Sequence, residues 1–432
     1  MFVSENLSVN AAGHLSIGGA DAVSLAAEYG TPLYVMDEAL IRKHCAEFRG
    51  SMERFYGGRG LVCYASKAFC CKAMCRVMQE EGMGLDVVSG GELYTAMSVG
   101  FPADKICFHG NNKTDAELRY ALECGVGRII VDNMEELSRL NRLAAEAGVT
   151  AGIMFRIKPG IDAHTHDFVK TGQIDSKFGF ALETGEAFEA VRAAIACEHL
   201  QLRGLHCHIG SQIFDIAPFE EAAEVMLHLI AKIKQELHYE IAELNLGGGF
   251  GIKYVESNDP VPYATYMERV STRVKACCEA LGITQPFILI EPGRSVAAPA
   301  GVTLYTAGAV KHIPNIRTYV SVDGGMADNP RYALYKSEYD ALVANKAGEP
   351  KTETVTIAGK CCESGDLIGE GMAIQPVTAG DIIAVCATGA YNYSMASHYN
   401  RIPMPAVVFV RDGASRVVVK RETYADLVQN DL

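Results

Sequence analysis

The sequence predicts an α/β fold in which a closed (β/α)8 barrel of the TIM type is joined to a separate all-β domain at its C-terminal side. Short β-rich segments alternate with helix-like stretches eight times within about 230 residues, which is the usual size of such a barrel. A polar or glycine residue follows each of these segments, and the alternation stops after Arg294. A doubly wound open sheet is the structural alternative, but eight regular units favour closure.

The strand and helix segments follow one another in a regular order. Alternation of strands with helices produces a parallel sheet with crossover helices, so each β-rich segment is expected to be a parallel strand. In chain order, the expected strands are residues 61–65, 85–88, 106–109, 128–131, 152–157, 205–209, 243–246 and 287–290. The helices expected between them include residues 91–99, 115–123, 134–147, 218–238 and 263–280.

Distinctive residues stand at the C-terminal ends of the expected strands. Barrel enzymes build their active sites from the loops at that end of the barrel. One polar residue there would mean little, but eight such positions converging on one face predict a functional site. The residues are Lys67, Asp86 with Ser89, His109, Asp132, Arg156, His208, the glycines at 247–249, and Glu291.

The pattern changes in the last third of the chain. Residues 317–323, 354–358, 381–385 and 406–411 read as strands, and the joins between them are rich in Gly, Pro and Asn without a long helical stretch. Residues 1–31 fit the barrel poorly. We therefore predict a barrel domain of residues 32–294 and a β-rich domain formed by residues 1–31 and 295–432.

Composition and charge exclude several classes of function. The chain has 39 Lys and Arg against 52 Asp and Glu, a net charge of −13, which argues against a nucleic-acid binder. No apolar run approaches the roughly 18 residues of a membrane span, and the N-terminus does not resemble a signal peptide. The 14 cysteines include no C-x-x-C pair, which argues against a zinc ribbon. Many scattered thiols without a disulfide framework are typical of a cytoplasmic protein.

Lys67 follows an apolar strand in the segment Tyr-Ala-Ser-Lys-Ala. Taken alone, such a residue is more often a solvated loop lysine. At the mouth of a barrel, however, its amine would be partly enclosed, and an enclosed amine is suited to form a Schiff base with a carbonyl group.

A glycine-rich segment, Leu-Gly-Gly-Gly-Phe-Gly at 246–251, also follows a strand. Glycines at this place let backbone N–H groups approach an anion such as a phosphate, although a tight turn has the same composition. The segment lacks the G-x-x-x-x-G-K-[ST] pattern of a P-loop, so hydrolysis of nucleoside triphosphates has no support.

Two histidines, His206 and His208, stand at i and i+2 of one strand and so share a face. A metal site of a barrel hydrolase is one interpretation, but no carbamate lysine and aspartate complete such a site. His208 could instead stack on an aromatic cofactor, and His206 could be a hydrogen-bonded interior residue.

Glu291 begins the segment Glu-Pro-Gly-Arg at the last strand end. A buried glutamate is costly unless it is paired, so a specific cationic partner is expected, and a protonated pyridine nitrogen is one. Arg294 offers a planar fork for a carboxylate or a phosphate.

Three polar clusters in the β-rich domain bring together side chains that an amino-acid substrate would need, although polar loops are the default interpretation. They are Asn-Pro-Arg-Tyr-Ala-Leu-Tyr at 329–335, Cys-Cys-Glu-Ser-Gly-Asp at 361–366 and Gly-Ala-Tyr at 389–391.

Together these motifs resemble those of the diaminopimelate decarboxylases, a family of alanine-racemase-like, pyridoxal-phosphate-dependent barrel enzymes. The matching segments run in the family's order across roughly residues 60–395 and are highly specific as a set. They are YASKA, DVVSGGEL, HTHDFVKTGQIDSKFG, GLHCHIGSQ, LGGGFG, EPGR, NPRYALY, CCESGD and GAY.

The resemblance implies a role for each matching residue. Lys67 would hold pyridoxal 5'-phosphate covalently, His208 would stack on its ring, and Glu291 would pair with the ring nitrogen. Its remaining contacts would come from Ser211, Gly248, Gly249, Gly293, Arg294 and Tyr391. Substrate would be bound by Arg294, Arg331, Tyr335, Glu363 and Tyr391.

The resemblance also implies an obligate homodimer with shared active sites. In this family the Cys-Glu segment enters the active site of the partner subunit, and Cys362 would be the acid that protonates the carbanion left by decarboxylation. Cys361 is adjacent, but the register places Cys362 next to Glu363. No metal is implied.

The expected reaction is the decarboxylation of meso-2,6-diaminopimelate to L-lysine and carbon dioxide, the last step of lysine biosynthesis. Racemases of this fold class place an arginine where Glu291 stands, so the glutamate favours decarboxylation. Three alternatives remain: a decarboxylase of ornithine, arginine or a carboxylated polyamine, a cofactor-binding barrel without catalysis, and a metal-dependent hydrolase using His206 and His208.

Overall fold

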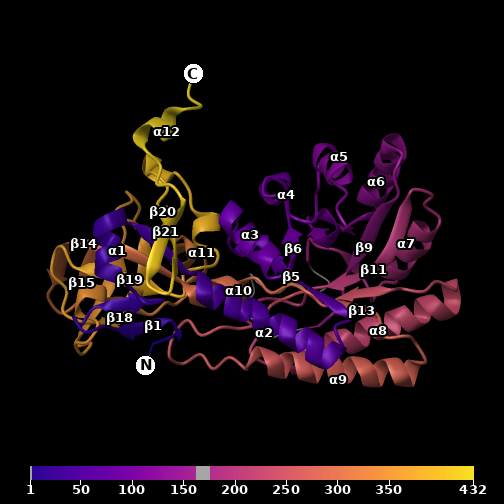
Figure 1. Ribbon diagram of the computed structural model, residues 1–432, viewed down its shortest axis with the longest axis horizontal. Coiled ribbons are helices and arrows are strands. Elements are labelled where there is room, and N and C mark those ends of the chain that lie inside the picture. Colours follow the sequence, from indigo (N-terminus) through magenta and orange to yellow (C-terminus); the bar gives the residue numbers. More distant parts are fainter. Residues whose placement is uncertain (1, 162–175) are drawn as a thin grey trace. The chain divides into compact units, whose positions relative to one another are not determined.

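The computed structural model describes residues 2–161 and 176–432 (Figure 1). The chain divides into two compact units. The barrel unit comprises His44–Gly251 and Pro260–Gly293, and the sheet unit comprises Met1–Lys43, Ile252–Asp259 and Arg294–Leu432.

The barrel unit contains a closed ring of parallel strands. Within the part of the chain that the structure describes, eight strands follow the order β9-β11-β12-β13-β5-β6-β7-β8, and pairing of β8 with β9 closes the ring. A short strand, β10 (Phe180–Ala181), pairs with the last two residues of β9. The strands are β5 (Gly60–Ala65), β6 (Gly84–Val87), β7 (Ile106–Phe108), β8 (Arg128–Val131), β9 (Ala151–Lys158), β11 (Leu200–Cys207), β12 (Glu243–Asn245) and β13 (Phe287–Ile290). The predicted barrel is confirmed, and each expected strand overlaps one of the eight.

Helices alternate with these strands along the chain. α8 packs against α9 on the outside of the ring (Figure 1). None of the helices that the structure describes is both long enough and apolar enough to cross a bilayer. The helices are α2 (Glu38–Tyr56), α3 (Lys72–Glu80), α4 (Gly90–Met97), α5 (Asp115–Cys124), α6 (Met134–Ala147), α7 (Glu186–Ile195), α8 (Ala217–Leu237) and α9 (Tyr263–Leu281).

Local signals in the sequence fix where these helices begin and end. The side chain of Thr114 accepts a hydrogen bond from the backbone N–H of Glu117, whose side chain accepts one in return, so a capping box starts α5. Asn133 caps α6 through the N–H of Glu136, and Gly148 ends that helix with the left-handed conformation that glycine favours. α6 begins shortly after β8 and its polar residue Asp132, whereas a longer loop that starts with His109 separates β7 from α5.

The interior of the barrel is filled by side chains from alternate positions of its strands. Five of them, at most 1% exposed, form one apolar cluster. Because the interior is packed, the polar residues at the strand ends form the floor of a site and do not line a channel. The cluster consists of Cys63, Cys107, Ile130, Met154 and Leu289.

The sheet unit is built around the long strand β14, which pairs with β4, β15 and β19. The main sheet has the order β18-β17-β15-β14-β4-β20-β21, β16 pairs with β19, and β1, β2 and β3 form a small sheet. The helices of this unit, apart from the start of α2, are short. The strands are β1 (Leu7–Val9), β2 (Leu15–Ile17), β3 (Ala20–Asp21), β4 (Leu33–Asp37), β14 (Gly301–Ile313), β15 (Arg317–Val322), β16 (Ala341–Val343), β17 (Glu353–Ala358), β18 (Leu367–Ile374), β19 (Ile382–Cys386), β20 (Ala406–Arg411) and β21 (Ala414–Val419), and the helices are α1 (Ala22–Tyr29), α10 (Arg294–Ala297), α11 (Arg331–Tyr335) and α12 (Tyr424–Val428).

A separate β-rich domain is thus confirmed as part of the fold class. β4 precedes the barrel in the chain, but it pairs with β14 and β20 and lies in the sheet unit. The domain boundaries at residues 31/32 and 294/295 stay a prediction from the sequence.

Candidate active site

The strand-end residues of the barrel unit gather at one end of the ring. Lys67 lies in a single 3-10 turn directly after β5, His109 follows β7, and Glu291 follows β13. Asp86 lies within β6, and burial raises its pKa, on which four other charged side chains also act. These four are His109, Glu291, Lys67 and Arg156. Four of the predicted strand-end residues therefore interact electrostatically with a fifth, Asp86.

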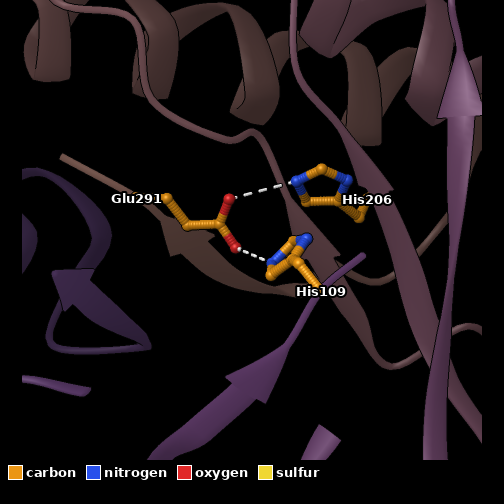
Figure 2. A group of neighbouring side chains, drawn as sticks. All are labelled: His109, His206 and Glu291. Carbon is orange, nitrogen blue, oxygen red and sulfur yellow. Dashed lines mark hydrogen bonds and ion pairs between the residues drawn. The ribbon is translucent and has the colours of Figure 1, made fainter. Parts of the chain in front are cut away.

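Glu291 is the centre of a buried hydrogen-bond network (Figure 2). Its side chain is only 7% exposed. Oε1 accepts hydrogen bonds from His109 Nε2 at 2.7 Å and from Asn245 Nδ2 at 2.6 Å, and Oε2 accepts one from His206 Nε2 at 3.1 Å. Burial alone would raise the pKa of Glu291, but the two histidines outweigh it and hold that pKa well below the usual value. The carboxylate is therefore ionised at neutral pH.

The two histidines of β11 and the loop after it are neutral at neutral pH. Burial lowers the pKa of His206 to about 4, so this imidazole donates to Glu291 as an uncharged group. Burial, followed by the charge of Lys67, lowers the pKa of His208 well below its usual value. His208 Nδ1 accepts the backbone N–H of Gly248 at 3.3 Å, which is consistent with an uncharged ring. A neutral imidazole can stack on an aromatic ring without adding charge.

The metal interpretation paired His206 with His208. In the described residues, however, the ligand-type atoms that cluster are those of His109, His206 and Glu291, which all lie within 4.8 Å of one another. Two ligands of one tetrahedral zinc ion stand roughly 3.4 Å apart. The distance of 2.7 Å between His109 Nε2 and Glu291 Oε1 is shorter and is that of a strong hydrogen bond. The cluster is thus fully explained as a hydrogen-bond network.

The glycine-rich loop after β12 requires glycine for two reasons. Gly247 and Gly249 adopt positive φ angles of 70° and 110°. A Cβ atom on Gly248 would collide with the carbonyl oxygen of Glu291. The loop therefore packs its backbone directly against the end of β13 and leaves no room for side chains. Ser211 lies in the loop after β11 and is partly exposed.

The sheet unit contains a second group of predicted residues, two buried arginines among tyrosine rings. The Arg294 guanidinium lies 4.7 Å from the centre of the Tyr391 ring, and its Nη1 donates a hydrogen bond to the Tyr254 hydroxyl at 2.6 Å. Arg331 lies 5.5 Å from the Tyr391 ring and 5.8 Å from the Tyr335 ring. Burial alone would raise the pKa of Tyr254, but the two guanidinium charges hold it below its usual value.

Two features of this arginine group are typical of binding sites. Arg331 is 8% exposed, its Nη2 donates to Ser337, and its Nε has no acceptor in the described residues. Tyr391 adopts a positive φ of 62°, a strained conformation for a tyrosine and one that is found mainly at functional sites. A buried guanidinium with an unused donor is suited to a carboxylate ligand.

The Cys-Cys-Glu segment forms a tight loop held by Asp366. The Asp366 carboxylate accepts the backbone N–H groups of Met326 at 2.5 Å and Cys361 at 2.7 Å. Cys361 is buried, and burial raises the pKa of its thiol to about 11, whereas Cys362 and Glu363 are exposed. The loop thus presents Cys362 and Glu363 on the surface of the chain and keeps Cys361 inside.

Sequence reasoning missed some participants. Asn245 and Tyr254 carried no recognised signal, although Asn245 is the last residue of β12, where a strand-end argument would have found it. Residues 164–175, most of the HTHDFVKTGQIDSKFG segment, lie outside the described residues. In the part of this segment that is described, the backbone N–H of Gly179 donates a hydrogen bond to Asp132 Oδ2 at 3.0 Å.

The comparisons with known proteins agree with this geometry. Residues 38–298 match the family model described as pyridoxal-dependent decarboxylase, pyridoxal binding domain. Diaminopimelate decarboxylase of Bacillus subtilis is 51% identical over 432 residues, covering 100% of this chain and 98% of the relative. The enzyme of that name from Bacillus methanolicus is also 51% identical, covering 98% of each chain.

A solved structure gives the same result. The crystal structure of diaminopimelate decarboxylase from M. jannaschii in complex with L-lysine is similar, with a TM-score of 0.92 and 35% identity, and the match covers 100% of this chain and 99% of that one. This chain therefore belongs to the pyridoxal-dependent decarboxylases and, among them, to the diaminopimelate decarboxylase family.

Proposed function

We propose that this chain decarboxylates meso-2,6-diaminopimelate to L-lysine and carbon dioxide, the last step of lysine biosynthesis, with pyridoxal 5'-phosphate as its cofactor. The observation that carries the proposal is the ionised, buried Glu291 at the mouth of the barrel. An anionic side chain keeps a pyridine nitrogen protonated, and a protonated ring is the stronger electron acceptor.

The residues of the barrel unit fit this cofactor. The cofactor, when bound, withdraws electrons from the substrate Cα, which makes loss of carbon dioxide feasible. In this proposal Lys67 holds it through the side-chain amine, Glu291 pairs with its ring nitrogen and the neutral ring of His208 stacks on it. Its other contacts come from Ser211, Gly248, Gly249 and Gly293 of this unit, and from Arg294 and Tyr391, which belong to the sheet unit. The glycine loop supports the phosphate assignment because backbone N–H groups without neighbouring side chains can approach an anion closely.

The residues of the sheet unit supply the substrate contacts in this proposal. The unused Nε donor of Arg331 and the guanidinium of Arg294 suit a carboxylate, and Glu363 suits the distal ammonium group of diaminopimelate. Tyr335 and Tyr391 pack on the arginines and complete the set. The M. jannaschii relative was solved with L-lysine, the expected product, which supports this assignment.

Cys362 is assigned the final proton transfer, in which its Sγ–H gives the proton that replaces the carboxylate at the substrate Cα. Its exposure is consistent with a role in a partner subunit, because a residue that serves another chain must lie on the surface. The proposal therefore includes a homodimer with shared active sites. The described residues include all 14 cysteines as free thiols, which favours the reducing cytoplasm as its location.

A product assay tests the proposal. Purified protein with added pyridoxal 5'-phosphate is offered meso-diaminopimelate, L-ornithine, L-arginine and carboxynorspermidine, and carbon dioxide and the amine products are measured. We expect carbon dioxide and L-lysine from meso-diaminopimelate alone, and no turnover by Lys67→Ala. Activity on one of the other three substrates instead would keep the cofactor but overturn the roles of Arg331 and Glu363.

A further inference from the structure

The hydrogen bonds on Glu291 are unevenly distributed between its two carboxylate oxygens; Figure 2 draws those from His109 and His206, and Asn245 donates a third. Oε1 accepts from His109 and Asn245, whereas Oε2 accepts only from His206. Each carboxylate oxygen has two lone-pair sites. In the described residues, Oε1 is therefore saturated, and Oε2 keeps one open acceptor site.

His109, which follows β7, donates one of the two hydrogen bonds to Oε1 and so contributes to this asymmetry. The residue is 4% exposed, and its ring packs edge-on against the His206 ring, with 4.7 Å between the ring centres and an angle of 69°. Its Nε2 also lies 3.7 Å from Asp86 Oδ1. Carboxylates only accept hydrogen bonds when ionised, so His109 must carry the proton on Nε2. It stands between the two acids and donates to Glu291.

We propose that His109 is a positioning residue. Together with Asn245 it occupies both acceptor sites of Glu291 Oε1, so that Oε2 is the single oxygen that can accept a hydrogen bond from the ring nitrogen of the cofactor. The inference deepens the proposed function and rests on it. Without His109, Oε1 would regain an open acceptor site in a buried pocket. Both carboxylate oxygens would then have an open acceptor site for the single N–H donor of the ring, and the orientation of the carboxylate toward the ring nitrogen would no longer be fixed.

The test compares the affinity of the cofactor-free enzyme for two molecules that differ only at this nitrogen. These are pyridoxal 5'-phosphate and its 1-deaza analogue, in which a C–H replaces the ring nitrogen, and both keep the aldehyde and the phosphate. Dissociation constants are measured by spectroscopic titration for the wild type, His109→Phe and His109→Gln. Phenylalanine keeps the ring volume without a donor, and glutamine keeps an N–H donor at a similar reach.

We expect the wild type to prefer pyridoxal 5'-phosphate over the analogue, and His109→Phe to reduce that preference by about tenfold or more, as expected for loss of a hydrogen bond to a charged group. Affinity for the analogue should stay the same, and His109→Gln should restore most of the preference. In a Glu291→Gln background, His109→Phe should have no further effect on the ratio.

Equal losses of affinity for both molecules in His109→Phe would mean a merely structural role and would overturn the inference. An unchanged ratio would overturn it as well. If the phenylalanine variant does not fold, His109→Leu, which also lacks a donor, must show the same selective loss. A wild type that releases no carbon dioxide from any substrate would overturn the proposed function. If the wild type is active and His109→Phe leaves the ratio of the two dissociation constants unchanged, only the role of His109 is overturned.

Discussion

Asp328 of the sheet unit shows how burial changes a single carboxyl group. It is 2% exposed. Its Oδ1 accepts a hydrogen bond from the Tyr305 hydroxyl at 2.5 Å, and its Oδ2 accepts the N–H of Gly325 at 2.9 Å. Burial raises the pKa of Asp328 to about 7, although both hydrogen bonds act to lower it. The group is thus half-protonated at neutral pH.

This raised pKa predicts a pH dependence of stability. An unfolded aspartate has a pKa of about 4, so between pH 4 and 7 the folded state binds more protons than the unfolded state. The contribution of Asp328 to the free energy of unfolding is fully present below about pH 4 and is lost as the pH rises through 7. Its size is a few kcal/mol at most. In Asp328→Asn, the free energy of unfolding measured with urea should change less with pH between pH 4 and 7 than it does in the wild type.

The exposed Asp259→Asn variant is the matched control and should leave the slope unchanged. An Asp328→Asn protein with the wild-type slope between pH 4 and 7 would contradict the shifted pKa.

At the residue scale, the sequence predicted which side chains stand at the strand ends but not how they pair. Glu291 was expected to need a cationic partner inside the site, and the chain itself surrounds it with two histidines and Asn245. His109 was recognised only by position. Hydrogen bonds between residues that are 182 and 85 positions apart depend on closure of the barrel, which no local pattern encodes.

At the element scale, the connection between β7 and α5 is anchored by a buried ion pair. Lys113 Nζ donates to Glu136 Oε1 at 2.6 Å, to the Ile130 carbonyl at 2.7 Å and to the Gly110 carbonyl at 2.9 Å. Lys113 and Glu136 are 2% and 0% exposed. Each of the three ammonium N–H groups donates one hydrogen bond, so the loop that follows His109 is held against β8 and α6.

Removing one partner of this pair should be far more costly than removing both. Lys113→Met leaves Glu136 buried without its cation, which costs about 3–5 kcal/mol of unfolding free energy. The double variant Lys113→Met with Glu136→Leu should recover most of that loss. The check is a double-mutant cycle of urea unfolding, in which additive losses would contradict the pairing. Arg119→Met, which removes an exposed partner of Glu146, should change stability little.

The elements themselves were predicted unevenly. The eight barrel strands were found because each is a short apolar run followed by a polar residue. β14 was not found, although it spans 13 residues, because it pairs with three strands and its exposed half breaks the apolar pattern. β4 was not among the expected strands either, and its partners β14 and β20 lie hundreds of residues away in the chain. Partner choice at such distances is set by the tertiary fold.

At the scale of the whole molecule, the proposed homodimer rests on where two of the assigned residues lie in one chain. Cys362 and Glu363 are exposed on a loop that Asp366 fixes, and the family resemblance assigns that loop to the site of a second subunit. A two-fold homodimer has equivalent interfaces, so each loop would complete the other subunit's site.

Mixing two inactive variants tests this arrangement. Lys67→Ala removes the residue that holds the cofactor, and Cys362→Ala removes the proton donor, so each homodimer should turn over poorly. When the subunits exchange, half of the dimers are mixed. Shared sites would give each mixed dimer one site with Lys67 from one chain and Cys362 from the other, and activity should rise to about a quarter of the wild type.

The alternative arrangement gives a different result. If Lys67 and Cys362 of the same subunit served one site, every site in a mixed dimer would lack one of them and mixing would restore nothing. Cys361→Ala is the control, because this buried thiol has no assigned role, and its homodimer should remain active. Failure of the mixture to gain activity, with subunit exchange verified by differently tagged chains, would place each active site within a single subunit.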